Sequence, residues 1–366
     1  MKHSALDFLV CNICHSTLTL AVEEERSATA DTLSEVITGS LQCTKCGKVF
    51  PIRRGVPRFV DEAISSAQNL ETGERFGIAW KEFPRLDSRY REQFFDWIYP
   101  VEPSFVKGKV VLEGGCGKGR HAELIADAEA EHIFAVDIGE AVDVTFENVG
   151  QRKQIHVIQC DICALPFKPV FDFAFSVGVL HHMESPQQGF QSLVDVLKPD
   201  GAICAWVYGR ENNWWLINIV NPVRTAITAH MPAQPLKLLA ALLAAPVFVY
   251  AKLFASPYMK LKEKLPLPDL FYGAYLSYIA RFDFNEIHHI VFDHLVAPVS
   301  NYLPGGEVRS WFEKANFPEP IIRWHNKNSW SGFADRSAST MLEMRNRIAK
   351  RSSILLINDV ISTAKR

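Results

Sequence analysis

The sequence lacks three features that would each have indicated a class of protein. Lysine and arginine number 39 against 41 aspartates and glutamates, a net charge of −2, so the overall basic field of many nucleic-acid-binding proteins is missing. Eight cysteines among 366 residues do not resemble the disulfide framework of a small secreted domain. Residues 1–10 include Asp7 and no long apolar core, which argues against a signal peptide. We therefore expect a globular, cytoplasmic protein.

A strongly apolar stretch lies in the second half of the chain but is too short to cross a membrane reliably. About 14 uncharged residues, 238–251, lie between Lys237 and Lys252 and contain Pro246. A bilayer crossing needs roughly 20 apolar residues, so this stretch is more typical of a buried or interfacial helix. We expect a helical lid or a dimer contact, and docking of 236–255 on a membrane surface stays open as the alternative.

A glycine-rich turn organises the first half of the chain, and two nucleotide-binding motifs are absent from it. Residues 109–112 predict a buried strand that ends at Glu113, and three glycines at alternate positions precede a predicted helix. A phosphate-binding P-loop requires Gly-Lys followed by Ser or Thr, but Lys118 is followed by Gly119. A dinucleotide fingerprint would need a glycine where Arg120 stands. Strand, glycine turn and helix still predict a nucleoside pocket in an open α/β sheet.

Acidic residues close the next two predicted strands. The strand over 132–136 ends at Asp137, roughly 20 residues beyond the glycines, where an acid can hydrogen-bond ribose hydroxyls. The strand over 155–159 is followed by Asp161. Strands alternate with helical patterns in this part of the chain, which predicts a parallel sheet covered by helices.

Taken in order, the motifs of residues 107–210 resemble those of the class I S-adenosylmethionine (SAM) methyltransferases. The turn Glu-x-Gly-x-Gly-x-Gly resembles their motif I, and the run over 177–182 is similar to the branch that includes quinone-biosynthesis enzymes. The resemblance implies a Rossmann-like α/β fold, with a seven-stranded, mostly parallel sheet and helices on both faces, and SAM as cofactor. It places cofactor contacts at Glu113, Gly115, Cys116, Gly117, Gly119, Asp137, Ile138, Asp161, Ile162 and Ser176.

Two adjacent histidines, His181 and His182, are the predicted catalytic residues. Methyl transfer from a sulfonium is an in-line displacement that requires alignment and the exclusion of water. An acceptor that carries a proton also benefits from a base that titrates near neutrality, as histidine does. The alternative is that both histidines only wall the cofactor pocket.

Two Cys-x-x-Cys pairs lie near the N-terminus: Cys11, Cys14, Cys43 and Cys46. Four thiolates can close a tetrahedron around Zn²⁺, although the spacer of about 28 residues exceeds the usual spacing of such pairs. Residues 1–60 resemble the zinc ribbon of tRNA-methyltransferase activator proteins. The predicted zinc is structural, because four cysteine ligands leave no open coordination position.

The remainder divides into three predicted parts. Residues 61–106 form an aromatic-rich connector whose start, 65–74, has the polar composition of a linker. Residues 211–300 are a helical insertion after the fifth strand, and residues 301–366 complete the sheet and add a C-terminal helix over 341–365. Because such an insertion lies over the carboxyl edge of the sheet, three residues are predicted to line an acceptor pocket: Asp293, His294 and Tyr302.

These motifs predict a SAM-dependent methyltransferase with an N-terminal zinc ribbon. The expected acceptor is a small molecule, lipid-like or glycan-linked, because the net charge is near neutral and the insertion is apolar. RNA is the alternative acceptor, since ribosomal-RNA guanine methyltransferases also carry an N-terminal zinc module. A degenerate scaffold is the second alternative, and the intact glycines and acids argue against it. The methylated atom and the oligomeric state do not follow from the sequence.

Overall fold

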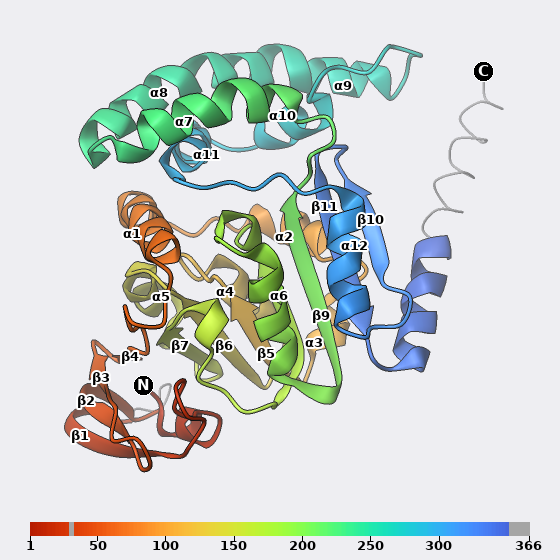
Figure 1. The fold of residues 1–366 in the computed structure, drawn as a ribbon. Helices are drawn as coiled ribbons and strands as arrows, with labels where there is room; N and C mark the ends of the chain where they lie inside the picture. The colour runs from red at the N-terminus through yellow and green to blue at the C-terminus, as the bar shows by residue number, and fades with distance from the viewer. Residues whose placement is uncertain (29–32, 351–366) are drawn as a thin grey trace.

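The computed structural model describes residues 1–28 and 33–350. A seven-stranded sheet with the order β10–β11–β9–β8–β5–β6–β7 forms its centre (Figure 1). Neighbouring strands from β7 to β9 run parallel, whereas β11 runs antiparallel to both β9 and β10. The strands are β5 (Val110–Gly114), β6 (His132–Asp137), β7 (Ile155–Gln159), β8 (Phe171–Val177), β9 (Leu197–Tyr208), β10 (Ile321–His325) and β11 (Ser329–Asp335). The predicted fold class is confirmed.

The sheet is buried on both faces, as a parallel sheet with crossover helices must be. Successive residues of β5 point to opposite sides, so Val111 and Leu112 belong to two different hydrophobic clusters. One cluster is covered by α6 (Pro186–Asp195) and α12 (Gly305–Lys314). The other is covered by α4 (Arg120–Asp127), α5 (Ala141–Val149), α2 (Tyr90–Trp97) and α3 (Pro103–Val106).

The N-terminal module is a small antiparallel sheet joined to the edge of the large one. Its elements are the 3₁₀ helix η1 (His3–Asp7) and the strands β1 (Leu18–Arg26), β2 (Glu35–Cys43), β3 (Val49–Arg53) and β4 (Val56–Pro57). After β4 the chain runs parallel to the edge strand β7, where Arg58 bridges Gln159 and the Phe59 amide donates to the Gln159 carbonyl at 2.7 Å. Apolar residues of the module and the sheet share one cluster.

A buried lysine fastens this module to the methyltransferase-like half of the chain. The Lys2 ammonium donates to the carbonyls of Gly150 and Ile155 at 2.7 and 2.6 Å and lies 3.6 Å from a Glu35 carboxylate oxygen. Only 5% of Lys2 is exposed, and this burial lowers the pKa of its ammonium. A buried ammonium is tolerated where it is paired in this way.

We expect Lys2→Met to reduce the free energy of unfolding by about 3 kcal/mol, because two buried carbonyls and Glu35 lose a donor. Urea denaturation measures the change. Lys168→Met is the matched control: that exposed ammonium also donates to a backbone carbonyl, at 3.0 Å, and we expect less than about 0.5 kcal/mol there. Equal effects of the two substitutions would contradict this account of the junction.

The connector begins with a helix where its composition predicts a linker. The helix α1 (Ala67–Glu82) starts at Ser66, whose Oγ accepts the Asn69 amide at 3.1 Å. Gly73 packs so closely on the loop after β6 that a Cβ there would lie 2.4 Å from the Ile138 side chain. The linker prediction for 65–74 is therefore wrong, because capping and close packing outweigh the polar composition.

The insertion forms a separate helical layer over the carboxyl ends of the strands (Figure 1). Its helices are α7 (Asn221–Ala226), α8 (Ala233–Tyr250), α9 (Ser256–Lys262), α10 (Gly273–Ile279) and α11 (Phe284–Val296). A π-helical turn, η6 (Ala251–Ala255), joins α8 to α9, so the continuous helix spans Ala233–Lys262 and exceeds the uncharged stretch noted above. By length and composition it could cross a membrane, with 22% of its most apolar window buried, but a single such helix is weak evidence for a span.

Residues 338–350 are helical, and the rest of the C-terminal helix predicted over 341–365 lies outside the described residues.

Candidate functional site

A cavity of about 900 Å³ lies between the carboxyl ends of the strands and the insertion helices. Its wall includes the glycine turn after β5, the ends of β6 and β9, and side chains from α1, α2, α8, α10 and α11. Ligand pockets measure roughly 300–1,000 Å³, so this cavity lies near the upper end of that range. Its position at the strand ends is where open α/β sheets bind ligands.

The glycine turn forms one end of the cavity and leaves no room for side chains. Gly115 has φ +85°, and a Cβ there would lie 2.2 Å from Val179. Gly117 has φ +54°, and its Cβ would lie 2.8 Å from the Trp80 indole. Both the left-handed backbone and the close approach therefore require glycine. The helix α4 begins directly after this turn, so its first amides face the cavity end of the sheet.

Two aspartates stand at the ends of adjacent strands and line the same end. Asp137 accepts the Gly117 amide at 3.0 Å on one carboxylate oxygen and the Gly139 amide at 2.9 Å on the other. Burial raises its pKa, and these backbone donors oppose the shift. Asp161 accepts the Cys163 amide at 2.9 Å through one oxygen. Each carboxylate keeps further lone pairs for ligand hydroxyl or amino groups.

Most of the predicted cofactor contacts lie in the cavity wall: Gly115, Cys116, Gly117, Asp137, Ile138, Asp161 and Ile162. The other three, Glu113, Gly119 and Ser176, lie outside the wall. Glu113 is 3.1 Å from Nδ1 of His121 in the core, and Ser176 donates to the Gly114 carbonyl at 2.9 Å. Burial raises the pKa of Glu113 well above its ordinary value and lowers that of His121 well below its ordinary value. The Glu113 and Ser176 side chains support the glycine turn from the core, and cofactor contact at the three positions stays a prediction.

The two predicted catalytic histidines occupy different places. His182 lines the cavity, with Nδ1 2.6 Å from the Val299 carbonyl, and burial lowers its pKa to about 3. His181 lies behind it, stacked on Tyr208 with ring centroids 3.9 Å apart, and its pKa is lowered well below the ordinary value by burial. A catalytic role for either histidine stays a prediction.

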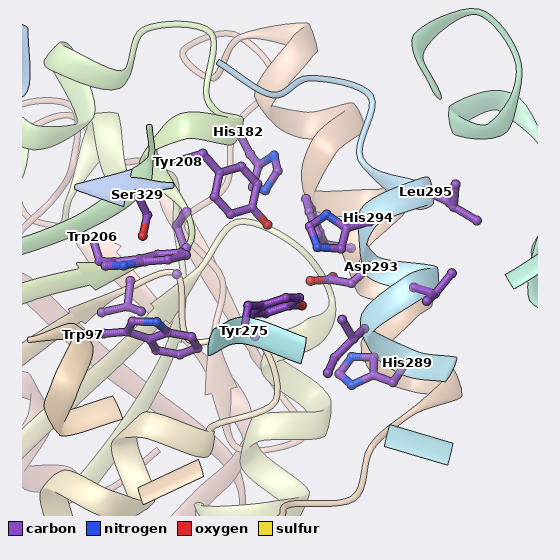
Figure 2. A pocket seen from close by; sticks show the side chains of 18 of the residues that line it. Trp97, His182, Trp206, Tyr208, Tyr275, His289, Asp293, His294, Leu295 and Ser329 are labelled. Atoms are coloured by element: carbon purple, nitrogen blue, oxygen red, sulfur yellow. The ribbon is translucent and has the colours of Figure 1, made fainter. Parts of the chain in front are cut away.

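The other end of the cavity is an aromatic chamber, which we define by Trp97, Trp206, Tyr208, Tyr275 and Tyr302. Figure 2 shows Trp97 and Trp206 one above the other, with Tyr208 and Tyr275 facing the same space. The ring centroids of the two tryptophans are 5.0 Å apart. Asp293 and His294 reach the chamber from α11. Asp293, His294 and Tyr302, which were predicted to line an acceptor pocket, all line this cavity.

The sequence contained a signal for part of this chamber that motif reading missed. Trp206 and Tyr208 alternate at the carboxyl end of β9, so both point to the same face of the sheet. No local pattern marks Trp97 or Tyr275, because α2 and α10 reach the cavity only through the tertiary fold.

Two cations, from the glycine turn and from the start of α4, line the cavity. Lys118 is 2% exposed, donates to the Phe83 carbonyl at 3.1 Å, and has its pKa lowered to about 8 by burial. The Arg120 guanidinium lies over the Tyr90 ring at 4.1 Å. Neither forms an ion pair with a carboxylate in residues 1–28 and 33–350. An anionic ligand group is the partner they are placed to bind.

The four predicted zinc ligands come together in the N-terminal module, outside the cavity wall. Their sulfur atoms all lie within 4.8 Å of one another, with 3.7 Å between Cys11 and Cys46 and 3.4 Å between Cys14 and Cys43. A tetrahedron with Zn–S bonds of about 2.3 Å has sulfurs about 3.8 Å apart, so the cluster fits zinc. The long spacer forms the antiparallel strands β1 and β2, which bring Cys43 back next to the first Cys-x-x-Cys pair.

Family models match two parts of the chain. Residues 112–205 match the family described as methyltransferase domain, and residues 2–55 match the Trm112p-like protein family. The expected resemblance, the SAM-type cofactor and the zinc-type cluster are thereby confirmed.

Curated relatives carry one shared name, tRNA U34 carboxymethyltransferase. That of Idiomarina loihiensis is 31% identical over 127 residues, which cover 32% of this chain and 38% of the relative. The relative from Aeromonas hydrophila is 29% identical over 160 residues, which cover 38% of this chain and 49% of the relative. The relative from Shewanella oneidensis is 28% identical over 179 residues, which cover 41% of this chain and 53% of the relative. The chain spans about half the length of the curated relatives it matches.

Solved structures are similar to this chain at lower sequence identity. A complex of the Haloferax volcanii Trm112 methyltransferase activator is 11% identical with a TM-score of 0.41, covering 75% of this chain and 99% of that one. The magnesium protoporphyrin IX methyltransferase of Synechocystis is 12% identical with a TM-score of 0.40, covering 71% and 93%. At TM-scores below 0.5 neither likeness bears on function.

The relatives' names correct the prediction of the acceptor. A small-molecule, lipid-like or glycan-linked acceptor is wrong, because the curated relatives are named for tRNA. The matching partner prediction of a small-molecule or lipid-like acceptor is wrong for the same reason, whereas membrane contact through 236–255 stays a prediction. The error arose because net charge, averaged over the chain, says nothing about a local face, and because the apolar composition of the insertion does not specify the ligand of the cavity that it helps to line. The chain joins a Trm112p-like module, residues 2–55, to a SAM-dependent methyltransferase domain, residues 112–205.

Proposed function

We propose that this chain transfers a methyl group from SAM to a nucleoside of an RNA. The observation that carries the proposal is the continuity of the cavity, which joins the glycine turn and its two aspartates to the aromatic chamber. The names of the curated relatives and the Trm112p-like module support RNA as the acceptor.

The residues present at the glycine end fit SAM. Asp137 has lone pairs left for the ribose hydroxyls, and Asp161 has an oxygen free of backbone contacts for the adenine amino group. The apolar side chains of Ile138 and Ile162 line the same end and can enclose the adenine ring. When bound, SAM supplies an electrophilic methyl carbon on a sulfonium.

The aromatic chamber fits a nucleobase. Proteins that modify RNA read unstacked bases by stacking them on aromatic side chains, and enzymes that act on a base take it out of the helix into such a pocket. Stacking on an aromatic side chain is worth roughly 1–3 kcal/mol per base. Trp97, Trp206 and Tyr275 offer ring faces to one space next to the cofactor end.

A carboxymethyl group is the second candidate for the transferred unit. The unpaired cations Lys118 and Arg120 favour it, because they stand in the cavity wall and a carboxylate is the kind of group they bind. The relatives carry this chemistry in their names.

The test is transfer of label from methyl-labelled SAM to separated tRNA, ribosomal RNA and a small-molecule extract. We expect label in an RNA fraction, dependent on the purified chain. A parallel reaction with the carboxymethyl sulfonium analogue of SAM as donor, followed by mass spectrometry of the digested nucleosides, tells methyl transfer from carboxymethyl transfer. Label confined to the extract would contradict the proposal. Trp206→Ala should weaken RNA transfer about tenfold or more while SAM binding is kept.

A further inference from the structure

Asp293 reaches from α11 to the side of the aromatic chamber. Figure 2 shows it reaching from α11 into the cavity between Tyr275 and His294. Its Oδ1 is buried and has no hydrogen-bond partner in the described part of the chain. Because a buried acceptor without a donor is costly, such an oxygen is expected where a ligand supplies the missing hydrogen.

The groups that face Asp293 come from the glycine turn and from four helices and strands. Tyr208 lies at the end of β9 and Tyr275 on α10, while Lys118 and Arg120 come from the glycine turn and α4, and Glu286 lies on α11 itself. Burial raises the pKa of Asp293 to about 6, against the opposing effect of the two cations. The carboxylate is therefore mostly ionised at neutral pH and gains a proton as the pH falls through about 6.

The neighbouring histidines are poorer candidates for proton transfer. Burial lowers the pKa of His182 to about 3 and that of His294 to about 4. A general base works best when its pKa lies near the operating pH. The Nδ1 of His182 lies 2.6 Å from the Val299 carbonyl, so Nε2 is its only nitrogen left to accept a proton, and its low pKa is what disfavours it as the base.

We propose that Asp293 is the general base of the acceptor site, and that it selects an RNA nucleoside whose reacting nitrogen or oxygen carries a hydrogen. The inference rests on the proposed function and assigns the base of that same site. The acceptor's lone pair forms the bond to the transferred carbon, the carbon–sulfur bond breaks with its electron pair left on sulfur, and the acceptor's proton passes to Asp293. The proton leaves to solvent with product release.

The Asp293→Asn variant tests the base by three readouts. We expect the single-turnover rate to fall at least about 100-fold, as general bases typically contribute that much or more. Affinity for S-adenosylhomocysteine, measured by calorimetry, should stay within about twofold, because Asp293 stands in the aromatic chamber and the glycine turn and two aspartates form the other end. Infrared difference spectra of the wild type should show a carboxyl that titrates near pH 6 and is absent from the variant.

The pH dependence of kcat/KM distinguishes an aspartate base from a histidine base most sharply. In the wild type kcat/KM should fall as the pH drops through about 6, and Asp293→Asn should lack that limb. A histidine base with a pKa of about 3 would leave the rate level over the same range. Asp195→Asn makes the same chemical change at an exposed position on α6, outside the cavity, and should match the wild type.

Failure of the inference and failure of the proposed function are separable. A wild-type chain that alkylates no RNA would refute the function. If the wild type alkylates RNA and the rate of Asp293→Asn lies within about tenfold of it with the same pH dependence, only the assignment of Asp293 as the general base is refuted. An Asp293 carboxyl that does not titrate between about pH 5 and 7 in the infrared spectra would refute the base whatever the RNA result.

Discussion

Asp137→Asn is expected to weaken SAM binding by roughly 100-fold. The carboxylate accepts one backbone amide on each oxygen, from Gly117 and Gly139, and its remaining lone pairs face the cavity. Asparagine would place an NH₂ group against one of those amides and lose a charged acceptor for the ribose. Hydrogen bonds to charged groups are worth about 1.5–3 kcal/mol each, and about 2.8 kcal/mol corresponds to 100-fold. Isothermal titration calorimetry measures the change.

Asp172→Asn is the matched control for this substitution. Asp172 lies on β8 outside the cavity wall, where it accepts the Val110 amide and pairs with Lys198 at 2.7 Å. We expect it to bind SAM like the wild type. An Asp137→Asn protein that remains folded and also binds SAM like the wild type would remove the cofactor assignment from this end of the cavity.

Cys43→Ser should remove bound zinc and lower the melting temperature by more than about 10 °C. The four sulfurs form a closed ligand set, and zinc sites of this kind contribute binding energy directly to folding. The apolar core of the N-terminal module is continuous with that of the large sheet, so unfolding of the module should also expose one face of that sheet. Calorimetric melting and zinc content by mass spectrometry measure the two effects.

Cys163→Ser is the control for the zinc site, because this half-buried cysteine lies outside the four-sulfur cluster. It should retain one zinc per chain. A wild-type chain purified without zinc, and with a melting temperature that added zinc does not raise, would show that the four thiols pack without a metal.

The glycine end of the cavity could be predicted because its determinants are local. The turn requires glycine at positions with positive φ, and the strands on either side read as short apolar runs. Asp137 and Asp161 follow such strands directly, so the parallel topology brings both to one edge. The resemblance placed Glu113 among the cofactor contacts, and that stays a prediction. Its side chain lies 3.1 Å from Nδ1 of His121 in the core, an orientation that a sequence pattern does not specify.

The acceptor end could be predicted only in part. Asp293, His294 and Tyr302 were found because an insertion after the fifth strand must lie over the strand ends. Trp97 and Tyr275 come from helices separated from β9 by long stretches of chain, and neither carries a periodic signal that points to a cavity. The acceptor's class was misjudged for a related reason, since composition averages over surfaces that the fold separates.

The central claim is that SAM and an RNA nucleoside meet in one cavity, with the cofactor at the glycine turn and the base in the aromatic chamber. A crystal structure of the chain with S-adenosylhomocysteine and a short methylatable RNA tests it most directly. We predict ribose hydroxyls within hydrogen-bond distance of Asp137 and a base stacked beside Trp206. Adenosine bound elsewhere, or an RNA base that stays outside the chamber, would contradict the account.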